Sequence, residues 1–275
     1  MVSCSNLLSL NEKKYIIKLK RYYFTLKTQN KTITHPDGTR LAFFSYKGSE
    51  PGIIFFSGYK SDMNGKKASS IQKFCIDHNI SFTKFDYFGH GKSEGKFEDG
   101  TISRWLEDSL LIFDKVTKGK QILIGSSMGS WIMFLLAIKR KEKISGVIGI
   151  ASAPDFTKAF WENLKLDTKK ELIEKGIFWQ NSQYNDGKTP ITYKLIVDSK
   201  KHYILEDEIN IDCPVRLIHG LKDNDALYTN SIKLAKKITS SDISIYFLPN
   251  GDHRLSEPNE INVIIKLLKD IKSLA

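Results

Sequence analysis

Cysteines and long apolar runs are both scarce in this chain. Its 275 residues include only three cysteines, Cys4, Cys75 and Cys213, and none of them forms a C-x-x-C pair or has the spacing of metal ligands. No apolar run reaches the roughly 18 residues that suggest a membrane span. We therefore expect no structural disulfide, no metal site and no stable membrane insertion, and a reducing, intracellular setting.

The first residues lack the pattern of a secretory signal, in which a basic region precedes a long apolar one. They are acid-poor and somewhat amphipathic, as in mitochondrial presequences, but they are rich in Lys rather than Arg. We therefore expect a cytoplasmic location, with the mitochondrial matrix as the alternative.

Acidic residues are scarce at this same end. Residues 1–31 contain seven Lys or Arg and only one acidic residue, Glu12, in a chain of net charge +11. The run KKYIIKLKRYYF (13–24) mixes bases with aromatic residues, a pattern that suits a phosphate-facing or membrane-surface segment. Solvated lysines on a first helix or strand explain the run more simply. We favour that interpretation and expect no nucleic-acid partner.

Strand-like and helix-like segments alternate along most of the chain. Strands are expected at 39–47, 52–56, 80–88, 122–124, 144–152, 213–220 and 242–250, and helices at 64–79, 101–116, 131–136, 227–238 and 259–275. Thr101 or Ser103 is available as the N-cap of the second helix. Strands that alternate with crossover helices imply an α/β fold with a mostly parallel sheet covered on both faces.

One block interrupts this alternation. Residues 154–212 contain no obvious parallel strand but hold a cluster of large apolar groups, Phe156, Phe160, Trp161, Leu164, Phe178 and Trp179. We expect 154–212 to be an inserted cap over one end of the sheet, with 1–153 and 213–275 forming the core of a single domain.

The segment KQILIGSSMGSWIMFLLAIKR (120–140) contains a sharp turn between two apolar stretches. Its centre, Gly125-Ser126-Ser127-Met128-Gly129, matches G-x-S-x-G, and it has the preceding strand and following helix that a nucleophile elbow requires. The glycines keep Cβ atoms out of a space that the backbone nearly fills. Ser127 is therefore the predicted nucleophile, at the carboxyl end of the sheet and the N-terminus of a helix.

A serine nucleophile needs a base and an orienting acid, which follow it in the chain order Ser, acid, His. Two histidines lie beyond the cap block. His253 falls in a loop between the last strand and the last helix, where a mobile base belongs, whereas His219 ends a strand and is interpreted as structural. Asp223 is the favoured acid because it follows a strand by a short turn, and Asp225 is its main competitor.

The oxyanion of an acyl-transfer reaction needs two backbone N–H donors. One is expected from Met128, the residue after the nucleophile, and the other from the loop that follows the strand at 52–56. In that loop, Tyr59 is the best candidate.

The segment DYFGHGKSEG (86–95) bears a limited likeness to phosphate-binding loops. A Walker motif would need Gly in place of Asp86, and G-x-G-x-x-G would need Gly in place of Glu94. We therefore expect no nucleotide and no other cofactor.

Taken together, these residues resemble the α/β-hydrolase superfamily over essentially the whole chain. A closer likeness is visible in FFSGYKSDMNGKKA, FDYFGHGKSEG, LIGSSMGSWIMF, VRLIHGLKD and GDHRLSE. These segments look like the subgroup that contains the mitochondrial hydrolase that removes palmitoyl groups from protein cysteines and cleaves acyl-glucuronide esters. The chain departs from relatives at Ser130, where they often have Gly, and at Ala226-Leu227-Tyr228, where they have Val-Pro.

The residues and the resemblance together predict a serine hydrolase that cleaves esters or thioesters with a hydrophobic acyl group. The expected substrate is a small-molecule ester or thioester, or an acylated protein. An acyltransferase and a C–C bond hydrolase share the triad and remain alternatives, as does a non-catalytic ligand binder on the same scaffold. The oligomeric state is not predicted.

Overall fold

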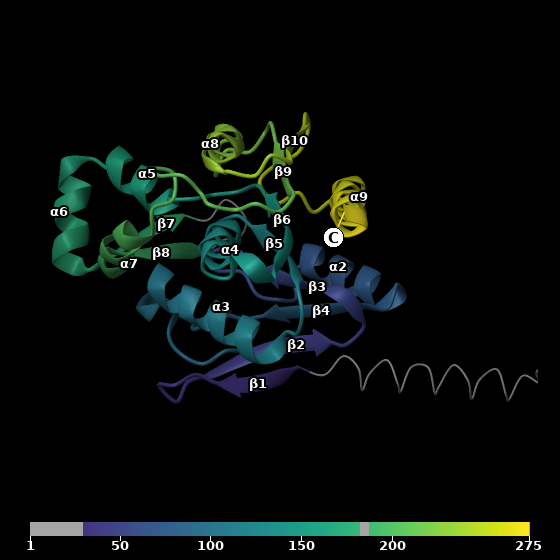
Figure 1. Cartoon of the computed structure of the whole chain (residues 1–275). Helices are drawn as coiled ribbons and strands as arrows, with labels where there is room; N and C mark the ends of the chain where they lie inside the picture. The colour runs from purple at the N-terminus through teal and green to yellow at the C-terminus, as the bar shows by residue number, and fades with distance from the viewer. Residues whose placement is uncertain (1–29, 182–186, 275) are drawn as a thin grey trace, which may run out of the picture.

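A computed structural model describes residues 30–181 and 187–274, and eight strands of this part form one central sheet (Figure 1). The sheet order is β1-β2-β4-β3-β5-β6-β9-β10. The strands are β1 (Lys31–Thr34), β2 (Arg40–Tyr46), β3 (Ser49–Phe56), β4 (Ile80–Phe85), β5 (Gln121–Ser126), β6 (Ile144–Ile150), β9 (Val215–Gly220) and β10 (Ile243–Leu248). Neighbours from β4 to β10 are parallel, while β2 is antiparallel to β1 and β4. The predicted α/β fold is confirmed.

Helices cover both faces of this sheet (Figure 1). On one face lie α3 (Ile102–Val116), α4 (Met128–Lys139) and α8 (Thr229–Lys237), and on the other lie α2 (Lys66–Asp77) and α9 (Pro258–Leu274). Thr101 is the N-cap of α3, and its Oγ1 accepts a hydrogen bond from the Arg104 amide over 3.2 Å.

The central strands read as continuous apolar runs because both of their faces are buried. In β5, Ile122 and Ile124 pack in the core on the α2 and α9 side, while Leu123 packs with the opposite core, which includes Trp105 of α3 and Phe134 of α4. All three isoleucine and leucine side chains of β5 are fully buried. This packing fixes the end of β5, and therefore Ser127, relative to both helical layers.

The segment between β6 and β9 lies outside the large sheet. Its elements are α5 (Phe156–Asn163), α6 (Leu166–Lys175), β7 (Ile177–Asn181), β8 (Lys188–Thr192), α7 (Tyr193–Ser199) and a 3₁₀ turn, Lys200–His202. β7 and β8 pair antiparallel, and Leu172, Ile191 and Ile196 form a small core with surrounding aromatic side chains. The predicted boundaries 1–153, 154–212 and 213–275 stay a prediction.

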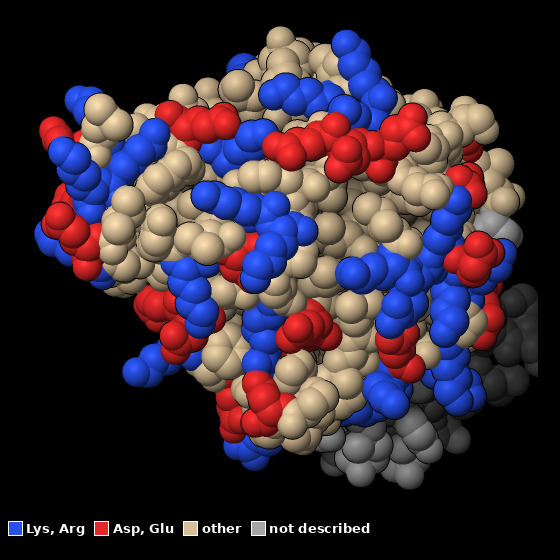
Figure 2. All heavy atoms as spheres, turned by 60° about the vertical axis from the view of Figure 1, so that its left-hand side comes forward, with Lys and Arg blue, Asp and Glu red and all other residues tan. Residues whose placement is uncertain are grey.

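The basic residues 1–29 lie outside the described part of the chain, so their interpretation also stays a prediction. Within residues 30–181 and 187–274, no helix combines the length and apolar character that crossing a bilayer requires. On the face shown in Figure 2, Lys and Arg side chains are interspersed with Asp and Glu rather than forming a continuous basic surface.

Candidate active site

The turn between β5 and α4 carries Ser127 in an unusual backbone conformation. Its φ of 55° and ψ of −125° are sparsely populated by residues with a side chain. A Cβ at Gly125 would lie 2.5 Å from the Ser130 Cα, and one at Gly129 would lie 2.3 Å from the carbonyl oxygens of Phe56 and Ser57. Only glycine fits at both positions, so the sequence itself dictates the close approach of helix and strand.

The Ser127 hydroxyl faces the imidazole of His253, which belongs to the loop between β10 and α9. His253 Nε2 lies 2.9 Å from Ser127 Oγ, and its Nδ1 lies 2.8 Å from Asp223 Oδ2. An ionised carboxylate only accepts hydrogen bonds, so Nδ1 carries the proton and Nε2 is left to accept from the serine. The structure thus joins Ser127, His253 and Asp223 in one hydrogen-bonded chain.

Asp223 follows β9, and its side chain is fully buried. Its Oδ1 accepts from the amides of Asp225 and Ala226, both over 2.9 Å, and its Oδ2 accepts from His253 and, over 3.0 Å, from His219. Burial raises the pKa of this carboxyl, but the hydrogen bonds from the two histidines outweigh it and hold the pKa well below its usual range. Asp223 is therefore ionised at neutral pH.

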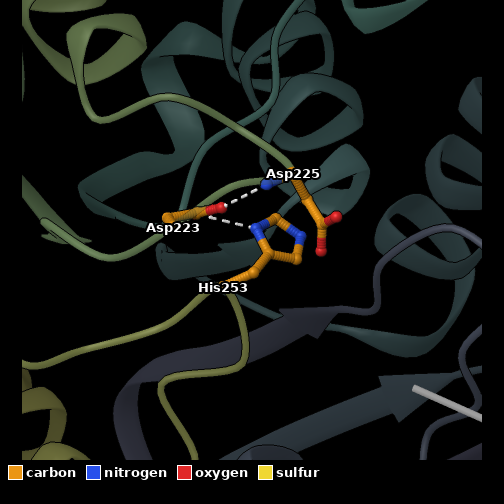
Figure 3. Close-up of side chains that lie close together, drawn as sticks. All are labelled: Asp223, Asp225 and His253. Carbon is orange, nitrogen blue, oxygen red and sulfur yellow. Dashed lines mark hydrogen bonds and ion pairs between the residues drawn. The ribbon is translucent and has the colours of Figure 1, made fainter. Parts of the chain in front are cut away.

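Asp225, the competing acid, lies on the other side of the His253 ring (Figure 3). Its carboxylate is exposed, whereas its amide supports Asp223. Ligand atoms of Asp223, Asp225 and His253 lie within 4.8 Å of one another, a spacing that suits a metal ion. However, Asp223 Oδ2 already accepts hydrogen bonds from His253 Nδ1 and from His219 Nε2. These hydrogen bonds favour the triad-like arrangement over metal ligation.

The two expected oxyanion donors flank Ser127. Met128 begins α4, and the first N–H groups of a helix have no partner within it. Tyr59 follows β3 by way of Gly58, where a Cβ would lie 3.3 Å from the Ser127 Cβ. The loop that carries the Tyr59 amide therefore passes directly beside the serine.

A cavity of about 1430 Å³ opens over Ser127 and His253. Residues of the 154–212 segment line it with apolar groups, among them Phe156, Phe160 and Ile191. The lining also carries charged residues of both signs, including Lys67, Asp252 and Arg254. The cavity can therefore contact both apolar and polar or charged parts of a ligand.

Sequence reasoning did not single out Lys67 for this site. Its ammonium group donates a hydrogen bond to the carbonyl oxygen of Arg254, the residue after His253. Burial lowers the pKa of Lys67 to about 8, although the nearby Asp252 and Glu260 raise it in part. Nothing in the local sequence marks this contact, because Lys67 and Arg254 lie 187 residues apart in the chain.

Comparisons with known proteins agree with this architecture. A family model described as serine aminopeptidase, S33, matches residues 52–188. Palmitoyl-protein thioesterase ABHD10, mitochondrial, from Bos taurus is 38% identical over 246 residues, which cover 89% of this chain and 80% of the relative.

Two solved structures are similar over nearly their whole length. Alpha/beta hydrolase domain-containing protein 10 from mouse superposes with a TM-score of 0.85 at 38% identity, covering 90% of this chain and 100% of that one. A hydrolase from Agrobacterium vitis S4 gives a TM-score of 0.85 at 33% identity, covering 89% of this chain and 98% of that one.

The fold and these similarities define an α/β-hydrolase, an enzyme that acts on ester or thioester bonds. More narrowly, the chain belongs to the α/β-hydrolase family that includes the palmitoyl-protein thioesterase ABHD10.

The expected cytoplasmic location is wrong. The similar relatives from cattle, rat and human are all named as mitochondrial proteins, which points to the mitochondrion. The error came from weighing the Lys-rich character of residues 1–31 above their shortage of acidic residues, although both features belong to the same segment.

Proposed function

We propose that this hydrolase works through a Ser-His-Asp triad of Ser127, His253 and Asp223 and forms an acyl-enzyme on Ser127. The observation that carries the proposal is the hydrogen-bonded chain from Ser127 Oγ to His253, over 2.9 Å, and from His253 to Asp223, over 2.8 Å. The strained turn at Ser127 supports it further, because such strain is typical of residues held for function.

In the first step, His253 Nε2 takes the hydroxyl proton as Ser127 Oγ attacks the carbonyl carbon of the substrate. Asp223 holds the imidazole in the required tautomer and stabilises the imidazolium that forms. The amides of Met128 and Tyr59 donate to the developing oxyanion, and each such donor contributes about 10²–10³-fold to the rate. The intermediate collapses as His253 returns the proton to the leaving thiol or alcohol.

In the second step, His253 removes a proton from water, which attacks the acyl-Ser127 carbonyl. The same two amides stabilise the second oxyanion. Collapse releases the carboxylic acid and returns the proton to Ser127, so the enzyme is restored without a cofactor in the reaction.

The acyl group of the substrate is proposed to be hydrophobic. Support comes from the apolar lining residues Phe156, Phe160 and Ile191, and we propose that residues 154–212 form the cap that covers this group. The similar relatives are named palmitoyl-protein thioesterases and mitochondrial proteins, which supports a long-chain acyl thioester, on a protein or a small molecule, as the substrate in mitochondria.

A chain-length series tests the proposal. Wild-type protein and the Ser127→Ala variant are assayed with p-nitrophenyl esters and matched acyl thioesters. The acyl chains of these substrates range from about two to about sixteen carbons, that is, from short to fatty acyl groups. We expect kcat/KM to rise with chain length for the wild type and turnover by Ser127→Ala to fall by about 10⁴-fold or more. Equal turnover by the two proteins would reject the triad, and a preference for the shortest chains would reject the hydrophobic acyl group.

A further inference from the structure

Asp223 contacts a second histidine besides His253. His219, at the end of β9, is fully buried, and its Nε2 lies 3.0 Å from Asp223 Oδ2 and 2.7 Å from the carbonyl oxygen of Ala226. Its Nδ1 lies 2.8 Å from the hydroxyl of Ser231, which is also fully buried in α8. The triad is thus extended by two buried side chains on the side away from Ser127.

The hydrogen-bond partners determine where the proton of His219 resides. A carboxylate oxygen and a carbonyl oxygen can only accept, so Nε2 carries the hydrogen that both of them share. Nδ1 then accepts from the Ser231 hydroxyl, and every polar atom of the neutral ring is satisfied. His219 is therefore held as a permanent donor toward Asp223, by α8 on one side and by the turn after β9 on the other.

This donor matters because a buried carboxylate is costly to ionise without compensating hydrogen bonds. Both histidines donate to the same oxygen, Oδ2, whereas Oδ1 is satisfied by the amides of Asp225 and Ala226. If the loop that carries His253 moves, Asp223 Oδ2 keeps its hydrogen bond from His219, which does not lie on a loop.

We propose that His219 is a positioning residue that keeps Asp223 ionised and correctly oriented, and that limits how strongly Asp223 stabilises the imidazolium of His253. The proposal rests on the triad proposed above. A carboxylate that already accepts from His219 is a weaker base toward His253. Loss of the His219 donor therefore strengthens the attraction between Asp223 and the imidazolium of His253, which moves the acid limb of the activity profile to higher pH.

Few other charged groups face this cluster among the described residues. His253 approaches from the loop after β10 and Asp225 from the turn that also holds Asp223, while α8 contributes the uncharged Ser231. Around His253, the charged side chains near the loop include Asp252, Arg254, Lys67 and Glu260 of α9. A change at His219 leaves all of these in place, so a shift in the pH profile reports on the donor to Asp223.

Two substitutions at His219 separate its donor from its volume. His219→Leu fills the site but removes the donor, whereas His219→Gln carries an amide N–H near the position of Nε2. The pH dependence of kcat/KM is measured with one acyl thioester for both variants and the wild type. For His219→Leu we expect the acid limb to shift upward by roughly one pH unit, and kcat to fall by about tenfold because Asp223 is no longer held in its productive orientation. His219→Gln should restore most of the wild-type profile.

A spectroscopic measurement provides an independent readout. We expect the Nδ1 proton of His253 to give a low-field ¹H NMR signal that moves in His219→Leu and returns toward its wild-type position in His219→Gln. If His219→Leu does not fold, His219→Asn replaces it, because the shorter amide does not reach Asp223.

The inference is overturned if the folded variant without the donor keeps both the wild-type pH midpoint and the wild-type proton signal, or if the Gln variant behaves like the Leu variant. Ser127→Ala, assayed in parallel, distinguishes the two proposals. An inactive Ser127→Ala with an unchanged His219→Leu profile rejects only the role of His219, whereas an active Ser127→Ala rejects the triad itself.

Discussion

The phenol of Tyr59 donates a hydrogen bond to the carbonyl oxygen of Pro190 over 2.6 Å, which joins the loop after β3 to β8. The neighbouring Lys60 adds a second link, from its ammonium group to the carbonyl oxygen of Lys188 over 2.6 Å. The Tyr59 ring also packs edge-on against Phe156 of α5, with 5.5 Å between ring centroids. The loop that carries the proposed oxyanion donor is thus attached to the 154–212 segment.

The Tyr59→Phe variant tests whether this attachment affects the reaction. The substitution keeps the ring and the backbone amide but removes the donor to Pro190, which costs about 1 kcal/mol for a typical hydrogen bond. We expect kcat for a long-chain thioester to fall by roughly 3- to 10-fold, because the amide is held less firmly. Tyr46→Phe is the control, since it removes a bond to Asn79 on the exposed surface. Equal kcat values for all three proteins would show that the link has no part in catalysis.

The glycine on the helical side of the Ser127 turn gives a second prediction. In Gly129→Ala, the new Cβ would lie 2.3 Å from the carbonyl oxygens of Phe56 and Ser57 at the end of β3, so the start of α4, and Ser127 with it, must shift. We expect a loss of about 1–3 kcal/mol in the free energy of unfolding and a large loss of activity. Gly65→Ala, whose Cβ would be 3.8 Å from its nearest neighbour, serves as the control in urea unfolding and activity assays. A fully active Gly129→Ala would contradict the close approach described here.

Much of the core could be predicted from sequence because its signals are local. β5 and α4 follow from an apolar run on each side of a glycine-rich turn, and the N-cap of α3 follows from Thr101. β1 was not expected, since it has only four residues, mostly exposed, and its position depends on antiparallel pairing with β2. The antiparallel pair β7–β8 was likewise not expected, because its small core is built from residues scattered between α6 and α7.

The sequence predicts the candidate site less completely, because several of its side-chain contacts depend on the paths of turns. The short turn after the strand suggested Asp223 over Asp225, but only the path of the turn after β9 shows which carboxylate is buried against His253. The contact of His219 with Asp223 has no signal in the sequence, because a histidine at the end of a strand can face either side. The hydrogen bond from Lys67 to the His253 loop depends on how α2 packs against that loop, and no residue near Lys67 in the sequence predicts it.

The depressed pKa of Asp223 leads to a prediction about stability. An ionised carboxylate with a lowered pKa stabilises the fold above the pKa of the unfolded chain, roughly 3.9, and this contribution is lost as the pH falls through the lower folded value. Asp223→Asn should therefore lower the free energy of unfolding at pH 7 by about 1–3 kcal/mol, with a difference from wild type that narrows under strongly acidic conditions.

Urea unfolding across pH measures this difference, and Asp225→Asn is the matched control because its carboxylate is exposed. We also expect kcat to drop by about 10⁴-fold in Asp223→Asn and by less than about tenfold in Asp225→Asn. The reverse ranking of the two variants would assign the acid to Asp225.

The most direct test of the account is to locate the covalent intermediate. Wild-type protein is treated with a fluorophosphonate, which reacts with an activated serine, and the adduct is mapped by peptide mass spectrometry, with Ser127→Ala treated in parallel. We predict one adduct, on Ser127, that matches the loss of thioesterase activity and is absent from the variant. An adduct on another residue, or full inhibition without modification of Ser127, would contradict the proposed mechanism.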